Sequence, residues 1–123
     1  MAIRRFVVPV TLSSGGAAEV YSPVLSGKLV SIRYVKDDFA DTVDFVLTAE
    51  DTGETLWSEE NVTASATRHP RAATHSTAGA AALYAAAGTA VNDKIALGQD
   101  RVKIVIANGG NATSGTFHIT IDG

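Results

Sequence analysis

The triplet Asp51-Thr-Gly is the first candidate for chemistry, because the same triplet carries the catalytic aspartate of aspartic proteases. Such a site needs an aspartate buried beside its twin and preceded by apolar strand residues, so that one carboxyl pKa is raised. In this chain Glu50 precedes the triplet and Glu54 follows it. This context is typical of an exposed hairpin tip, and the sequence argues against a protease.

Acidic and histidine side chains are the next candidates, as metal ligands. Four aspartates between residues 37 and 44 offer oxygen atoms to Ca²⁺, but their spacing lacks the glycine and the terminal glutamate of an EF-hand loop. The three histidines are too scattered for a ligand set, and the chain has no cysteine. We therefore expect no metal site and no cofactor, and we interpret the aspartates as solvated loop acids.

Motifs for other reactions are missing from the sequence. No serine lies in a Gly-x-Ser-x-Gly elbow, and Gly109-Gly110 joins two strands instead of opening a helix around a phosphate. The basic residues are few and are not interleaved with aromatic residues, as they are in nucleic-acid-binding strands. The sequence predicts a protein that is not an enzyme and that does not bind nucleic acid.

Basic and aromatic side chains remain as candidates for a protein interface. Arg68-His-Pro-Arg71 is the densest basic segment, and Arg4-Arg5 is a second one. Arginine forks pair well with carboxylates on a neighbouring subunit, and exposed aromatic rings anchor interfaces. For Trp57 a place in the core is the alternative. The candidate interface residues are Arg4, Arg5, Trp57, Arg68, His69, Arg71 and Tyr84.

Charge is divided unevenly along the chain, although the net charge is only −3. Residues 37–60 contain nine acidic side chains and no Lys or Arg, whereas the rest of the chain has ten basic and four acidic residues. These two parts therefore carry −9 and +6. Such a division suits self-association or docking, and acidic turns and outer strand faces are the alternative explanation.

Alternating side chains predict the strands that position these residues. Residues 6–12 alternate around Pro9, which indicates an edge strand, and residues 43–57 read as a hairpin whose turn contains Asp51-Thr-Gly. Further strands are expected at 19–25, 28–35 and 90–97. Residues 102–106 and 117–121 each place apolar side chains on one face and read as a terminal hairpin with a glycine-rich loop.

Small residues dominate positions 61–88, where the strand signal fades. We expect a long ordered connection there with one or two short strands. The alanine-rich stretch 80–87 could form a helical turn, but flanking glycines make an isolated helix marginal.

Length and strand spacing together predict the fold class. A chain of 123 residues is one domain, and seven to nine short strands without a convincing helix give an all-β sandwich, jelly-roll-like, with a long small-residue loop region. Residues 1–5 are interpreted as an N-terminal arm. No apolar segment is long enough for a secretory signal or a membrane span, so we expect a soluble cytoplasmic product.

The order of segments from Trp57 to the end resembles the head decoration, or capsid cement, proteins of tailed bacteriophages. The segments are the Arg-His-Pro-Arg-Ala stretch at 68–72, the glycine-rich stretch with Leu83-Tyr84, the strands at 92–107 and the closing strand at 115–123. The resemblance rests on this layout and on no invariant motif.

The resemblance implies a β-sandwich that binds the outside of a phage capsid and clamps adjacent copies of the major capsid protein. It also implies a homo-oligomer, with a trimer favoured over a dimer, and a location on the virion after assembly in the host cytoplasm. The alternative from another class is a tail or fibre protein that binds a host-surface glycan or another virion protein.

Overall fold

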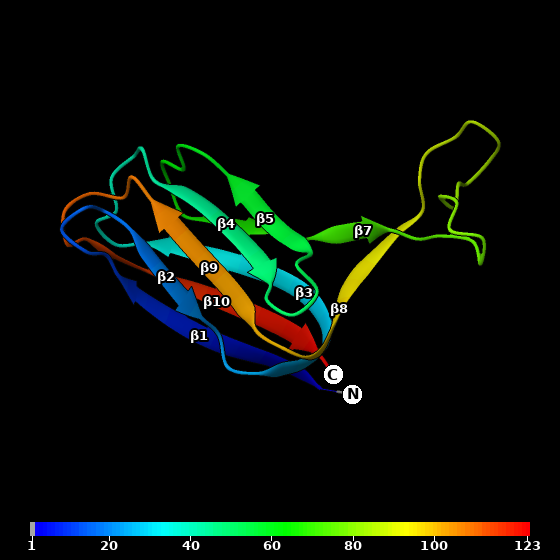
Figure 1. Ribbon diagram of the computed structural model, residues 1–123, viewed down its shortest axis with the longest axis horizontal. Coiled ribbons are helices and arrows are strands. Elements are labelled where there is room, and N and C mark those ends of the chain that lie inside the picture. The colour runs from blue at the N-terminus through cyan, green and yellow to red at the C-terminus, as the bar shows by residue number, and fades with distance from the viewer. Residues whose placement is uncertain (1) are drawn as a thin grey trace.

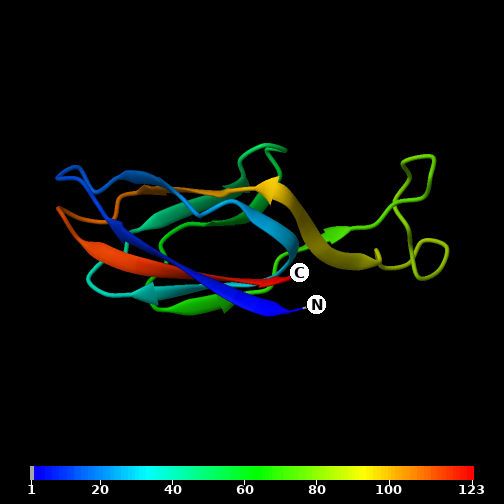
Figure 2. The same ribbon diagram turned by 90° about the horizontal axis from the view of Figure 1, so that it is seen from below.

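The computed structural model describes residues 2–123 and consists of two antiparallel β-sheets packed face to face (Figures 1 and 2). Sheet A contains β1 (Ile3–Thr11), β10 (Ser114–Asp122), β3 (Leu25–Lys36), β8 (Asn92–Asp100) and β7 (Arg71–Ala73) in that order, with β6 (Ala66–Arg68) also paired to β3. Sheet B contains β2 (Ala18–Tyr21), β9 (Val102–Ala107), β4 (Asp44–Ala49) and β5 (Thr55–Glu59). The prediction of an all-β sandwich is confirmed.

Strand pairing follows the jelly-roll plan, in which a chain folds into nested antiparallel pairs and then wraps into two sheets. The first strand pairs with the last, β2 with β9, β3 with β8, and β4 with β5. β6, β7 and the chain that follows them are an insertion between the β4–β5 hairpin and β8. The hairpin expected at residues 43–57 is therefore present.

Residues 102–121 do not form the expected terminal hairpin, and that prediction is wrong. β9 lies in sheet B between β2 and β4, whereas β10 lies in sheet A between β1 and β3. The glycine-rich loop between them is a corner that crosses from one sheet to the other. Gly109 N–H donates to Gly16 O at 3.0 Å, and a Cβ on Gly109 would lie 2.2 Å from a Leu12 methyl carbon.

The core lies between the sheets and is built by the inward-facing half of each strand. Tyr34, Phe45, Trp57 and Phe117 form its aromatic centre, with edge-to-face contacts such as Phe45–Phe117 at 5.1 Å between ring centroids. The apolar faces expected for residues 102–106 and 117–121 are both buried there. On β3 a bulge at Val30, opposite Thr120 and Ile121, breaks the alternation, so that Leu29 and Ile32 are the neighbouring buried positions.

The two ends of the chain lie at the same end of the sandwich (Figure 1). Of the expected N-terminal arm at residues 1–5, residue 1 is outside the described part of the chain. Residues 3–5 belong to β1 and pair with β10, with Arg5 opposite Thr120. The interpretation of residues 3–5 as an N-terminal arm is therefore corrected, because they form part of sheet A. Among residues 2–123 there is no helix that could cross a membrane.

Candidate interaction surfaces

A projecting arm is the most prominent feature outside the sandwich (Figures 1 and 2). β8 pairs with β3 only from Ile95 onward, and its first three residues pair with β7 instead, with Arg71 opposite Lys94. We call residues 71–94 the arm. It corresponds to most of the long small-residue connection expected from the sequence.

Backbone hydrogen bonds hold the arm together, because it has no core. Thr74 N–H donates to Val91 O at 2.8 Å, Ala82 N–H donates to Thr74 O at 3.0 Å, and Val91 N–H donates to Ala82 O at 2.9 Å. No residue from 71 to 94 is buried. Leu83 is 43% exposed and Tyr84 is 75% exposed.

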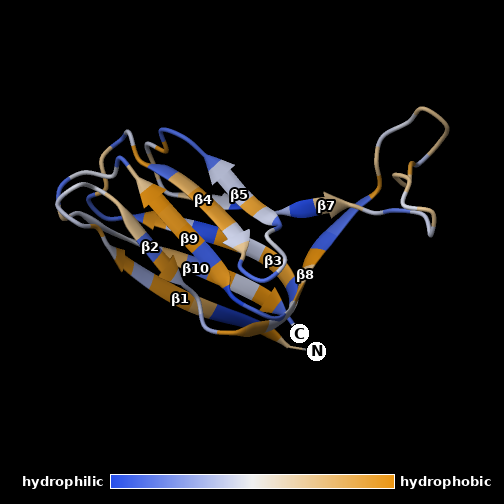
Figure 3. Cartoon of the chain, viewed as in Figure 1, coloured by the Kyte–Doolittle hydropathy of each residue, from blue (hydrophilic) through white to orange (hydrophobic). Residues whose placement is uncertain are grey.

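The arm is also free of charge along most of its length. Residues 72–92 contain no Asp, Glu, Lys or Arg, and Figure 3 shows mostly pale or tan colours along the outer part of the arm. Charged side chains gather at its base, where Arg71 and Lys94 lie. An uncharged segment with no fully buried side chain has the composition of a docking element.

The candidate interface residues are dispersed over several elements. Tyr84 lies on the outer part of the arm, and Arg71 at its base donates to Val30 O at 3.3 Å and to Pro70 O at 2.8 Å. His69 is exposed in the link between β6 and β7. At the other side of sheet A, Arg4 donates to Gly123 O at 2.7 Å, while Arg5 is exposed.

Arg68 and Trp57 lie in contact, Trp57 in the core and Arg68 at the surface above it. Trp57 is only 6% exposed, so the core alternative holds for it. The Arg68 guanidinium carbon lies 5.5 Å from the centre of the Trp57 ring, and Arg68 pairs with Glu59. This pair bridges β6 of sheet A and β5 of sheet B. Hydrogen bonds from Arg68 and Trp57 lower the pKa of the Glu59 carboxyl.

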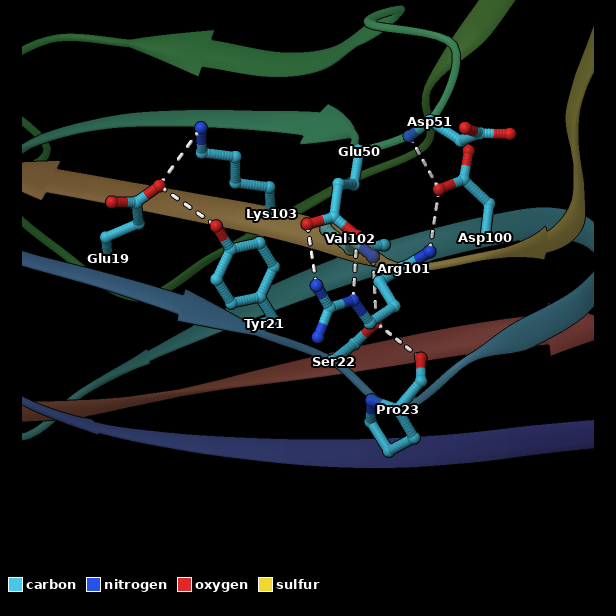
Figure 4. A network of polar contacts seen from close by, with 10 residues as sticks. All are labelled: Glu19, Tyr21, Ser22, Pro23, Glu50, Asp51, Asp100, Arg101, Val102 and Lys103. Carbon is cyan, nitrogen blue, oxygen red and sulfur yellow. Dashed lines mark hydrogen bonds and ion pairs between the residues drawn. The ribbon is translucent and has the colours of Figure 1, made fainter.

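A network of polar contacts on the outer face of sheet B was not predicted from the sequence (Figure 4). Arg101 donates to both carboxylate oxygens of Glu50, at 2.8 and 2.6 Å, and its guanidinium carbon lies 4.2 Å from the centre of the Tyr21 ring. The Tyr21 hydroxyl donates to Glu19 at 3.0 Å, and Lys103 pairs with Glu19 at 3.0 Å.

These contacts shift the acidity of the carboxyl groups in the network. The hydrogen bond from Arg101 lowers the pKa of Glu50, and those from Lys103 and Tyr21 lower the pKa of Glu19. Next to the network, the buried Asp100 carboxylate accepts hydrogen bonds from the backbone N–H groups of Asp51 and Arg101. Asp51 itself is exposed in the β4–β5 turn, as expected of a hairpin tip.

The acidic residues between 37 and 44 are all hydrogen-bonded or ion-paired. Asp37 and Asp38 accept hydrogen bonds from Ser114, Asp41 pairs with Lys36, and Asp44 accepts from Asn108 at 2.7 Å. Within residues 2–123 no group of three or more potential metal ligands comes together, and the described surface contains no pocket.

The two sheets carry opposite net charge. The strands of sheet A hold eight basic and three acidic residues, a net charge of +5, whereas those of sheet B hold one basic and three acidic residues, a net charge of −2. The turns that flank β4 and β5 add further acidic side chains, so the acidic segment 37–60 belongs largely to sheet B and its loops.

Comparison with known proteins leaves the family open. No protein-family model matches the chain, and no curated protein matches it. The case for a function therefore rests on the arm, the strand edges and the charge distribution. The arm carried one signal in the sequence, namely a run of 21 residues without a charge. The pairing of Arg101 with Glu50 carried none, because 51 positions separate the two residues.

Proposed function

We propose that this protein is a non-enzymatic structural protein of a tailed-bacteriophage virion. It binds the outer surface of the capsid as a decoration or cement protein and contacts the major capsid protein. The observation that supports this role best is the arm, an ordered projection that carries no charge from residue 72 to residue 92 and has no fully buried side chain.

The chemistry of the arm fits a partner that is a protein surface. Alanine, glycine, serine and threonine dominate its outer part, and Leu83 and Tyr84 are its large exposed hydrophobic side chains. Small side chains let a backbone lie close against a partner, and one aromatic ring can supply the buried anchor of the contact. Such an arm reaches a neighbouring capsid subunit while the sandwich rests on another.

Weak contacts suffice for this role when they are repeated. A protein that engages several capsid subunits at once converts later contacts into intramolecular ones and gains avidity without a large single interface. The charge difference between the sheets orients the protein on the shell, because one sheet is basic and the other acidic.

The arm can be removed without disturbing the sandwich, which gives a direct test. Thr74 N–H and Thr74 Oγ1 both donate to Val91 O at 2.8 Å, so these two residues are already paired across the ribbon. Replacing residues 75–90 with Asn-Gly closes the ribbon with a tight hairpin turn. We expect unchanged circular dichroism and an unchanged unfolding midpoint, together with loss of binding to expanded capsids in co-sedimentation.

A double substitution serves as the matched control for the shortened arm. Leu83→Ser with Tyr84→Ser keeps the length of the arm, and we expect it to weaken capsid binding at least tenfold. Val46→Ser, which removes an apolar side chain of similar exposure on sheet B, should leave capsid binding unchanged. Full capsid binding by the shortened protein would refute the role of the arm. Binding to tails or to a glycan array in place of capsids would favour the alternative function.

A further inference from the structure

β1 is the longest strand of the described chain that leaves one edge open along a single uninterrupted pairing, because β8, of equal length, divides its pairing between β7 and β3. It runs for nine residues, pairs only with β10, and keeps one continuous register throughout. The remaining outer strands are short: β2 has four residues, β5 has five with a bulge at Leu56, and β6 and β7 have three each. A long regular open edge is a template for pairing with another strand.

Two hydrogen bonds show which backbone groups of β1 face the open edge. Leu12 N–H donates to Thr113 O at 2.8 Å, and Gly123 N–H donates to Ala2 O at 3.0 Å. The N–H and C=O of one residue point to the same side of an antiparallel strand, and the side alternates from residue to residue. Even-numbered residues therefore bond to β10, and the backbone groups of Ile3, Arg5, Val7, Pro9 and Thr11 face outward.

Pro9 fits this arrangement, because its missing N–H falls at an outward position where the pairing with β10 loses nothing. The side chains of the same odd-numbered residues lie on the outer face of sheet A, since Val8 and Val10 are buried in the core. Ile3 is 64% exposed and Val7 is 51% exposed. The open edge is thus lined by exposed apolar side chains.

We propose that β1 pairs antiparallel with β1 of a second copy about a two-fold axis at Val7. Val7 is the centre of Ile3–Thr11, so this register overlaps the strand over its full length. Val7 then faces Val7 of the second copy, Ile3 faces Thr11, and Arg5 faces Pro9. Arg5 N–H donates to Pro9 O, but Pro9 has no N–H to return to Arg5 O, so the paired edge lacks two hydrogen bonds. The contact joins sheet A of the two copies into one continuous sheet.

Charge disfavours the neighbouring register centred on Arg5. Arg4 and Arg5 are the only charged side chains among the first 18 residues. With Val7 at the axis, the two Arg5 residues are four positions apart, about 13 Å along the strand, which exceeds a Debye length of about 8 Å. Pairing centred on Arg5 would place two like charges side by side and would be destabilising.

The contact is self-complementary, so it closes at two subunits and makes a dimer, in place of the trimer expected from the resemblance. This inference goes beyond the capsid proposal and does not depend on it. A single pair of strand edges is a small interface, and we expect a dissociation constant of about 10–100 μM.

Opposite charges placed at the two-fold axis test the contact. Val7→Lys and Val7→Glu each bring two like charges together, and we expect each variant alone to raise the dissociation constant at least tenfold in sedimentation velocity. An equimolar mixture of V7K and V7E should form a heterodimer, which only pairing of Val7 with Val7 predicts. Val105→Lys is the matched control, because Val105 is exposed on the outer face of sheet B.

A crosslink supplies a second measurement. The chain has no cysteine, and Val7→Cys places two thiols across the axis at a Cα separation of about 5.5 Å, within disulfide range. We expect oxidised V7C to run as a covalent dimer and oxidised Val105→Cys to stay monomeric. A wild-type protein that is monomeric at about 500 μM would overturn the proposal, as would V7K and V7E variants that dimerise as the wild type does.

Discussion

Arg68 of β6 donates from Nε and Nη2 to the two carboxylate oxygens of Glu59 on β5, at 3.0 and 3.1 Å. The contact joins the two sheets on the side opposite β1 and places the guanidinium over the ring of Trp57. An arginine that was expected to meet a neighbouring subunit is thus engaged inside its own. A charge reversal at Arg68 would therefore lower the stability of the subunit itself, so its effect on assembly could not be interpreted alone.

Removing this arginine should lower the stability of the sandwich. The ion pair is partly exposed, with Arg68 at 45% and Glu59 at 35%, so its net contribution is about 0.5–1 kcal/mol. The contact with Trp57 adds about 0.5 kcal/mol. We expect Arg68→Ala to reduce the free energy of unfolding by about 1 kcal/mol in urea titrations. Arg5→Ala, which removes an exposed arginine, should change it by less than about 0.5 kcal/mol. Equal effects of the two variants would contradict this account.

The polar network on sheet B should make stability depend on acidity. Glu19 and Glu50 have lowered pKa values in the folded protein, so their stabilisation is fully present above the unfolded value of about 4.3. It is lost as the pH falls through the lower folded values. We expect Arg101→Met to be less stable than the wild type at pH 7, and the two proteins to converge between pH 4 and pH 2.

The urea midpoint, followed from pH 7 to pH 2, measures this convergence. Glu54→Gln is the control, because Glu54 lies at the exposed β4–β5 turn and its side chain makes no hydrogen bond or ion pair with residues 2–123. This variant should follow the wild-type curve. A constant gap between Arg101→Met and the wild type at all pH values would show that the arginine acts through packing on Tyr21 alone.

The alternating pattern of the sequence predicted the faces of the strands well, because burial follows the two-residue period of a strand directly. Val43, Phe45, Leu47 and Ala49 occupy alternate positions of the predicted hairpin and are all buried. The alternating pattern does not indicate which of the two sheets a strand joins. A hairpin loop and a corner between sheets both favour glycine, so residues 102–121 read as a hairpin although Val102 and Phe117 lie on opposite sides of the core.

Two other features lay beyond the reach of the pattern. The bulge at Val30 shifts the inward positions of β3 by one residue, and nothing local in residues 28–35 marks it. The arm shows neither a two-residue nor a helical period, because its small side chains do not alternate between large apolar and polar residues. The arm is held in its conformation by backbone hydrogen bonds, such as the one from Thr74 N–H to Val91 O. Many combinations of small side chains allow these bonds, so the sequence does not predict them.

The Tyr34 hydroxyl is a buried donor without a hydrogen-bond partner in the described chain. Leaving such a group unpaired costs about 1–3 kcal/mol, whereas the tyrosine ring packs against Phe39, Phe45 and Phe117. We expect Tyr34→Phe to be at least as stable as the wild type, and more stable by up to about 1 kcal/mol. Tyr34→Ala should lose about 3–5 kcal/mol. A clear loss of stability in Tyr34→Phe would mean that the hydroxyl is satisfied.

Burial also raises the pKa of Tyr34 to about 12. Because the unfolded tyrosine ionises near pH 10, its protonated form supports folding fully below pH 10, and this support is lost as the pH rises towards 12. We expect the wild type to lose stability in this window faster than Tyr34→Phe does, as measured by the urea midpoint. Parallel curves for the two proteins would contradict the raised pKa.

Gly27 tests how tightly the last strand is held. Its φ is 137°, and a Cβ there would lie 2.7 Å from Asp122 O and 2.9 Å from Gly123 Cα. These are backbone atoms of the segment that closes sheet A, so Gly27→Ala must push β3 and the end of β10 apart. We expect a loss of about 2–3 kcal/mol in the free energy of unfolding.

Gly53 also has a positive φ but faces open space, so Gly53→Ala should cost only about 1 kcal/mol. Gly98 has neither constraint, and Gly98→Ala should stay within about 0.5 kcal/mol of the wild type. If Gly27→Ala and Gly53→Ala cost the same, backbone conformation alone explains Gly27, and the packing of the closing strand against it contributes nothing.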